Sequence, residues 1–285
     1  MTHDREEYIE QAYFFRALRE RLADKQPAQE VLGRLHEEVL STTRLPMAIE
    51  YLASELKFSG ILHPAMARLE HYFSPFQTFV ISQAENDRSR FDLSTGLLIL
   101  ERLADYFAGE PTRAGAFVFQ FESISRNRLG YDEGLQAISR DSYFDDGWQR
   151  WVRQVRTAVG TVDFTDLLYS RSEYYVQQRR RHAGDDESKK RPVLFGEKEG
   201  KIAWANRGKD PLYLFAALQR QLGYPVVPRP PRPDESVNLL QELQRKVQSL
   251  EKRIQILEGE LKGEMDLSKY YVKPDEEEAG DVPHP

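Results

Sequence analysis

Histidines and carboxylates with metal-site spacing are the first residues in this 285-residue sequence that could do chemistry. His36-Glu37 begins like the H-E-x-x-H motif, in which two histidines on one helical face bind zinc and the glutamate acts as a base. Leu40 occupies the second histidine position, so this site is excluded. His63 and His71 lie two helical turns apart, but Pro64 follows the first and no Glu-x-x-His pair accompanies them. We expect both histidines to be solvated or to cap a helix, and we expect no metal site.

A glycine-bounded stretch, Gly196-Glu-Lys-Glu-Gly200-Lys201, resembles a phosphate-binding loop. The stretch has three residues between the glycines where that loop has four, and two of the three are acidic. Ile202 stands where a serine or threonine would hold magnesium. Because carboxylates in a phosphate cradle would repel the ligand, we expect a turn at this place.

Carboxylates that could work as an acid and base pair are present at Glu122 and at Asp145-Asp146. Nothing in the sequence marks them as buried or paired, so we expect them to have surface or capping roles. Cysteine is absent, which excludes disulfides, thiolate zinc sites and cysteine nucleophiles. The serine-hydrolase elbow, the dinucleotide-binding fingerprint and the kinase motifs are also absent. An enzyme of a class without recognisable motif is therefore only the third hypothesis, and we expect no cofactor.

The strongest signal for a partner is a basic region at residues 179–209, which carries ten basic and five acidic side chains. Clustered lysine and arginine can neutralise phosphates or an acidic protein surface. Asp185-Asp186-Glu187 interrupts the cluster, so a solvated loop is the alternative interpretation. The candidate partner-binding residues are Arg179, Arg180, Arg181, Lys189, Lys190, Arg191, Lys198 and Lys201.

The elements that would position these residues are helices, because apolar residues recur at helical spacing between proline and glycine breaks over residues 1–224. Asp4 and Glu7 have the spacing of a capping box at the start of the first helix. A later helix should run from Pro46 to Gly60. The 15 phenylalanines and 14 tyrosines fall on the apolar stripes, where they predict core packing. The sequence therefore predicts an all-α body, either one domain or two with a seam at 109–111.

Two further segments of this body bear on the candidate sites. One predicted helix starts at Asp163 and continues through Tyr174-Tyr175. The stretch 193–204 has short apolar triplets on each side of Gly196 to Gly200, which is typical of a small β-hairpin or of a loop before a short helix.

Beyond the body, a proline-rich linker at 225–234 reads Pro-Val-Val-Pro-Arg-Pro-Pro-Arg-Pro from Pro225 to Pro233. Such a stretch favours extended polyproline geometry and predicts a stiff spacer, although its PxxP spacing is also typical of peptides that bind aromatic grooves. Residues 263–285 carry seven acidic and two basic side chains and should form a disordered acidic tail.

Between linker and tail, residues 235–262 carry a heptad repeat that predicts a coiled coil. Its a and d positions are apolar: Leu240, Leu243, Val247, Leu250, Ile254, Leu257 and Leu261. A parallel homodimer would place Lys246 opposite Glu251 of the second chain and Arg253 opposite Glu258, and both pairs attract. The helix from Leu240 to Leu261 would be about 33 Å long, so the coil is short. The alternative is a helix that folds back and buries the same stripe against its own body.

The overall composition favours a cytoplasmic protein. The formal net charge is −6, and the longest compact apolar run, Leu97 to Leu100, is far shorter than the roughly 20 residues needed to cross a membrane. Residues 2–7 are polar and charged, unlike a secretory signal. We therefore expect no membrane partner.

A resemblance rests on three stretches: Glu10 to Leu22, Leu194 to Ile202, and Asn206 to Pro225. Together they resemble a planctomycete-type family of bacterial proteins with no assigned activity, over most of residues 4–233. The resemblance implies a bacterial cytoplasmic origin, and it supplies no catalytic or binding residues.

The sequence thus predicts a non-enzymatic interaction or scaffold protein that forms a parallel homodimer and holds an unknown protein partner. The alternative is a protein that binds an anionic ligand or nucleic acid through residues 179–209.

Overall fold

The computed structural model describes residues 3–86, 91–183, 192–230, 243–251 and 254. This part of the chain is all-α, as predicted, and contains only two isolated β-bridges. In chain order the labelled helices are α1 (Arg5–Ala23), α2 (Ala28–Glu38), α3 (Leu45–Ser59), α4 (His63–Arg68), α5 (Pro75–Ala84), α6 (Leu93–Ala108), α7 (Arg113–Asn127), α8 (Tyr131–Arg140), α9 (Asp146–Ala158), α10 (Phe164–Tyr169), α11 (Glu173–Ala183), α12 (Glu197–Ala205) and α13 (Pro211–Leu222). Within these ranges, none of the helices is both long and apolar enough to span a membrane.

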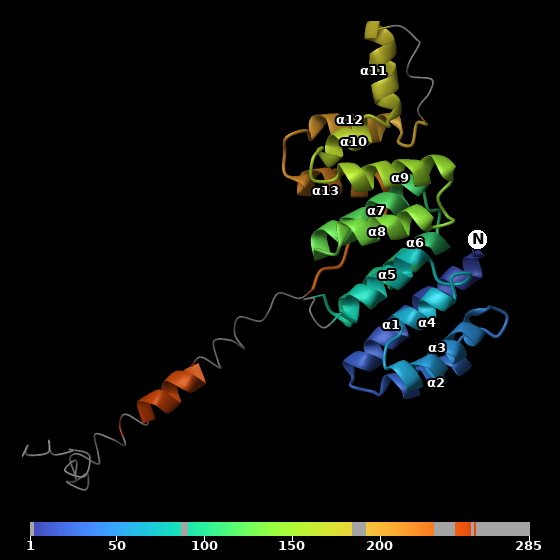
Figure 1. Cartoon of the computed structure of the whole chain (residues 1–285), viewed down its shortest axis with the longest axis vertical. Coiled ribbons are helices and arrows are strands. Elements are labelled where there is room, and N and C mark those ends of the chain that lie inside the picture. Colours follow the sequence, from blue (N-terminus) through green and yellow to red (C-terminus); the bar gives the residue numbers. More distant parts are fainter. Residues whose placement is uncertain (1–2, 87–90, 184–191, 231–242, 252–253, 255–285) are drawn as a thin grey trace, which may run out of the picture. The chain divides into compact units, whose positions relative to one another are not determined.

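The helices of the body succeed one another along its length, from α2 and α3 at one end to α11 at the other (Figure 1). The closest pairings are α1 with α6, α2 with α3, α8 with α9, and α10 with α12. Residues 1–230 form one compact unit, and a single hydrophobic core joins residues before and after the 109–111 segment. That segment is a connection between α6 and α7, so it does not divide the body.

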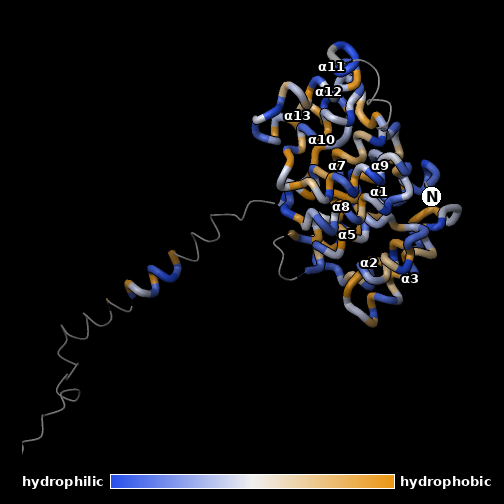
Figure 2. The backbone as a smooth tube through the Cα atoms, turned by 45° about the horizontal axis from the view of Figure 1, so that its top comes forward, coloured by the Kyte–Doolittle hydropathy of each residue, from blue (hydrophilic) through white to orange (hydrophobic). Residues whose placement is uncertain are grey.

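Helix α7 is the central element of the body, because every residue from Gly115 to Ile124 is buried. A helix buried on all sides must be covered by neighbours all round. Phe117 and Phe121 lie on this helix, and Phe121 stacks on Phe164 of α10 with ring centroids 4.1 Å apart. Trp151 of α9 meets Phe117 edge-on at 4.8 Å. Hydrophobic residues accordingly concentrate along α7 in the interior (Figure 2).

The segment after α13 covers a buried carboxylate on α7. Tyr224 is buried, and its hydroxyl donates to Glu122 Oε2 at 2.7 Å, while Arg126 pairs with the other oxygen of the same carboxylate. Asn127 Nδ2 donates to the Pro228 carbonyl at 3.1 Å. The predicted spacer at 225–234 therefore starts too early, because residues 224–228 are packed against the body. The surface or capping role expected for Glu122 is also wrong.

The stretch 193–204, for which a hairpin or a loop before a short helix was predicted, contains helix α12. The preceding strand-like residues pair with the chain before α11, where Glu173 N donates to the Phe195 carbonyl and Leu194 N donates to the Arg171 carbonyl, both at 2.9 Å. A Cβ on Gly200 would lie 2.3 Å from the Ser172 hydroxyl, so this glycine permits close helix packing and is not part of a phosphate loop. The loop-then-helix alternative was therefore the right one.

The structure also corrects one predicted helix start and one predicted helix continuation, and it confirms one predicted helix end. Asp4 is the N-cap residue of α1 but makes no side-chain cap bond. Glu7 does not complete a capping box either, since its carboxylate accepts from Arg44 N at 2.6 Å and from the Tyr72 hydroxyl at 2.9 Å. The helix that starts after Asp163 stops at Tyr169, and α11 begins after a turn at 170–172. The predicted end of α3 is confirmed, since Gly60 adopts the left-handed conformation with φ of 73°.

The C-terminal unit, residues 231–285, is described only in part. Residues 243–251 and Ile254 are helical, which agrees with the helix predicted over 235–262. The predicted tail at 263–285 lies outside the described residues.

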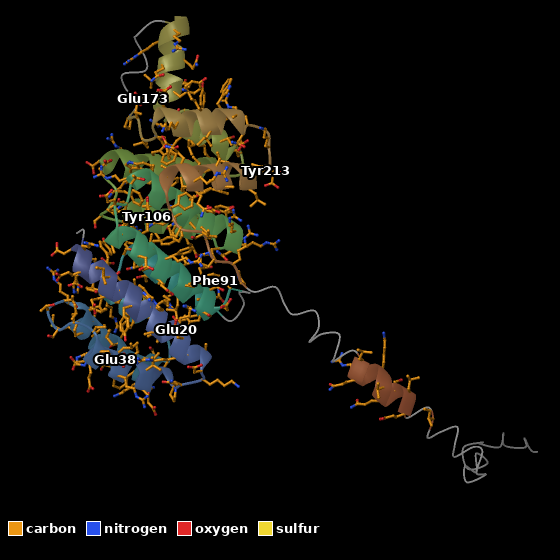
Figure 3. The ribbon with its side chains drawn as sticks, turned by 180° about the vertical axis from the view of Figure 1, so that it is seen from behind. Glu20, Glu38, Phe91, Tyr106, Glu173 and Tyr213 are labelled. Carbon is orange, nitrogen blue, oxygen red and sulfur yellow. The ribbon has the colours of Figure 1, made fainter. Side chains whose placement is uncertain are left out.

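We predict that Tyr224→Phe destabilises the body. Removing the hydroxyl leaves the buried Glu122 carboxylate without one donor, which should lower the free energy of unfolding by about 1–3 kcal/mol. Urea unfolding followed by circular dichroism measures this change. Tyr213→Phe is the matched control, because Tyr213 is 64% exposed and points away from the body (Figure 3); it should change stability by less than about 0.5 kcal/mol. Equal effects of the two substitutions on the free energy of unfolding would contradict the stabilising role assigned to the Tyr224 hydroxyl.

Candidate ligand pocket

A pocket of the described residues crosses α5, between α4 on one side and α8 on the other. Its volume is about 580 Å³, which lies in the range of small-molecule sites. The lining side chains come from the start of α1, α4 and its connection to α5, α5, the end of α6, and α8 with the turn after it. Segments far apart in sequence therefore meet at this place, and no single sequence motif marks it.

Aromatic rings form one wall of the pocket. Tyr8 stacks on Phe107 with centroids 5.1 Å apart, and Tyr143 meets Phe107 edge-on at 4.7 Å. The ring of His3 lies 5.5 Å from Tyr8 and 4.9 Å from Tyr72. These rings come from α1, the α4–α5 connection, α6 and the turn after α8, so their contacts hold four segments of the chain together.

A buried carboxyl group, Asp141, lies in the same pocket and is 5% exposed. Its Oδ1 accepts from Tyr143 N at 2.9 Å, and the Ser74 hydroxyl provides a further hydrogen bond. Burial raises the pKa of Asp141 and outweighs these hydrogen bonds and the nearby His3, which lower it. The sequence reasoning missed this residue, because nothing in the stretch around it predicts burial.

Buried amides and a carboxylate support the pocket from behind. Gln77 Nε2 donates to Gln11 Oε1 at 2.9 Å, and Gln77 also completes the capping box of Ser74 at the start of α5. Gln11 is fully buried and lines the pocket, and its Nε2 has no hydrogen-bond partner. A buried donor without a partner costs free energy, so it favours a ligand that brings an acceptor.

Both histidines considered from the sequence, His63 and His71, line this pocket. His63 Nδ1 lies 2.8 Å from Glu85 Oε2, and the same carboxylate accepts from the backbone nitrogen atoms of Leu62 and His63. The cap is therefore supplied by Glu85 and not by His63, whose ring pairs with that carboxylate, whereas His71 is exposed. The described residues contain no group of three or more His, Cys, Asp or Glu side chains that could hold a metal ion.

The other carboxylates considered from the sequence have structural roles. Asp145 Oδ1 caps α9 by accepting from the backbone nitrogen atoms of Gly147 and Trp148, and Oδ2 lies 3.1 Å from Arg113. Asp146 is exposed. Asp145 and Asp146 are therefore placed as expected, and neither lines the pocket.

In the described residues, the basic region at 179–209 is divided between α11, α12 and the turn after α12. Arg179, Arg180 and Arg181 lie on α11, and Lys198 and Lys201 lie on α12. Lys201 pairs with Glu197 at 2.5 Å, and Arg179 lies over the ring of Tyr175. Three of the predicted residues, Lys189, Lys190 and Arg191, lie outside the described residues.

Arg207 shows most clearly that part of this charge is used internally. Its guanidinium group lies over the rings of Tyr169 and Trp204, 4.3 and 4.1 Å from their centroids. Its Nε also lies 2.6 Å from Asp166 Oδ1. This arginine therefore joins α10 to the end of α12, and we do not count it among the partner-binding residues.

The apolar stripe predicted for self-association is exposed where the structure describes it. The exposed fractions are 49% for Leu243, 50% for Val247, 55% for Leu250 and 53% for Ile254. The remaining stripe residues, Leu240, Leu257 and Leu261, lie outside the described residues.

Comparison with known proteins found no match to any family model, curated protein or solved structure. The resemblance to a planctomycete-type family therefore stays a prediction.

We predict that Asp141→Asn makes stability less sensitive to pH. The folded-state pKa of Asp141 lies above its unfolded value, so its contribution to stability is complete below the unfolded pKa and is lost as pH rises through the folded pKa. The variant should therefore gain stability relative to the wild type as pH rises through this window. Thermal unfolding at a series of pH values measures the difference.

The matched control is Asp132→Asn, which should lose stability relative to the wild type as pH rises. Arg156 lowers the pKa of the exposed Asp132, so the contribution of this carboxylate is present above the unfolded pKa and is lost as pH falls through the folded pKa. If both variants gained stability with rising pH, the interpretation of Asp141 would be wrong.

Proposed function

We propose that this protein is a cytoplasmic, non-enzymatic interaction protein that self-associates through residues 235–262 as a parallel coiled coil. The observation that carries the proposal is the exposed apolar stripe on the helix at 243–251. Four consecutive positions of the heptad seam, from Leu243 to Ile254, are each about half exposed in the single chain. Soluble helices rarely leave such a stripe uncovered, because its burial is the main source of their stability.

The proposed occupant of the stripe is a second copy of the same helix. Valine and isoleucine at a positions with leucine at every d position favour a two-stranded parallel pair. The charges on each side of the seam complement a parallel copy, since Lys246 would face Glu251 of the partner. The absence of cysteine fits a reducing compartment.

The helical body would then hold a partner protein, and pairing would present two bodies at once. Two linked binding surfaces raise the effective concentration of the second contact, so pairing strengthens binding to a repeated or dimeric partner. A structural role of this kind requires only a stable body and a linker, both of which the sequence provides.

We predict that the full chain is a dimer and that a truncation after Pro233 is a monomer. Sedimentation equilibrium over a concentration series measures both masses. The truncation retains the compact unit of residues 1–230, so it should fold. Two monomers would favour the helix that packs against its own body, and two dimers would place the interface in the body; either result overturns the proposal.

We predict that Leu250→Asp weakens the dimer by at least about 10-fold, because two buried leucines are replaced by facing charges. Ser249→Asp is the matched control, since it adds the same charge at the neighbouring c position outside the seam. Sedimentation of the two variants at equal concentration makes the comparison. Equal dissociation by both substitutions would show that net charge, and not the seam, is responsible.

The second candidate function is binding of an anionic ligand or nucleic acid through α11. The observation in its favour is that Arg179, Arg180 and Arg181 follow one another on the helix at the end of the body (Figure 1). We predict that heparin binding, if it uses these residues, falls steeply with salt and is reduced by Arg180→Ala together with Arg181→Ala. Arg34→Ala on α2 is the control. Salt-insensitive or absent binding removes this candidate.

A further inference from the structure

We propose that the pocket across α5 binds an organic cation, namely an ammonium group attached to an apolar body, with the Asp141 carboxylate as its counter-ion. The inference goes beyond self-association and does not rest on it, because every residue that lines the pocket belongs to the body.

The charge of the lining favours a cation. Three carboxylates line the pocket, from Glu70, Glu133 and Asp141, against one guanidinium group, from Arg140. The lining also includes three imidazole rings, from His3, His63 and His71. Glu70, Glu133 and Arg140 are exposed at the rim, where solvent screens them. Asp141 is the buried charge, so it dominates the field inside the pocket.

The hydrogen bonds of Asp141 leave room for a further donor. A carboxylate has about four acceptor positions on its two oxygens. The described residues supply one backbone donor, Tyr143 N at 2.9 Å, and the Ser74 hydroxyl. An ammonium group would add a charge-assisted hydrogen bond, which is about twice as strong as a neutral one.

The cost of burying this carboxylate also indicates a cationic partner. Desolvation raises the pKa of Asp141 in the chain alone, which means that the charged form is held at a free-energy cost. A cation next to the carboxylate would offset that cost, since an opposite charge favours the ionised form. Asp141 is not the cap of a helix start, where carboxylates are commonly found.

The aromatic wall fits the apolar part of such a ligand. Tyr8, Phe107 and Tyr143 form a continuous set of rings beside Asp141, and Tyr72 closes the set on the side of His3. Aromatic rings attract organic cations and also bury hydrocarbon. A bare metal ion would use neither property, and a volume of about 580 Å³ is far larger than an ion needs.

The chemical class that these observations favour is therefore an amine with an apolar body.

The experiment compares matched ligands on the full chain by isothermal titration calorimetry. Benzylamine and N-methylbenzylamine are the cations, since both carry N–H donors for the carboxylate, and benzyl alcohol and benzoate are the neutral and anionic analogues of similar shape. We expect the cations to bind with a Kd of about 1 mM or tighter and the analogues to bind at least about 10-fold more weakly. No binding by either cation, or equal binding of all four compounds, overturns the proposal.

Two substitutions then test the site itself. Asp141→Asn keeps the shape of the side chain and removes its charge, so cation affinity should fall by about 10-fold or more, while Asp105→Asn on the exposed face of α6 should leave it unchanged. Ala67→Trp fills the pocket from its exposed edge and should abolish binding, with Ala205→Trp at the exposed end of α12 as its control. Unchanged affinity in both pocket variants, with the fold intact by circular dichroism, would place the binding elsewhere and overturn the assignment.

Discussion

The structure depends first on the burial of α7 on all sides. A helix with no solvent face needs neighbours in every direction, and α8, α6 and α13 pack against this one. The rings of Phe117 and Phe121 extend the contact to α9 and α10. One helix thus fixes the positions of elements from both halves of the chain, which explains why residues 1–230 form a single unit.

Full burial has a consequence for the polar residues that α7 carries. Glu122 obtains donors from Arg126 and from Tyr224, a residue about 100 positions away in the sequence. Asn127 obtains a carbonyl partner from Pro228 in the same segment. The segment 224–228 is therefore part of the fold, because without it these groups would be buried with fewer partners. Gln120 is the exception, since both its side-chain polar atoms are buried without a partner.

The pocket and the C-terminal helix represent two different kinds of incomplete burial. In the pocket, a carboxyl group is removed from water by segments that are needed for the fold, and an aromatic wall stands beside it. On the helix at 243–251, an apolar stripe remains in water. The first arrangement favours a small charged ligand and the second favours another helix, because each lacks a different kind of contact. The two proposals can accordingly be tested independently on the same chain.

The all-α class, several helix ends and a helix within 235–262 could be predicted from the sequence alone. These features follow from local spacing, as the Pro46 to Gly60 helix shows, and local spacing can be read from neighbouring residues. Tertiary structure decided the partners of the titratable groups. Glu7 left its capping position to bind Arg44 and Tyr72, and Asp141 was buried by residues from α1, α4–α5 and α6. The hairpin alternative failed for the same reason, because residues 194–195 found backbone partners at 171–173 instead of within their own stretch. Periodicity reports which face of an element is apolar, but the groups that meet across that face are set by packing between distant segments.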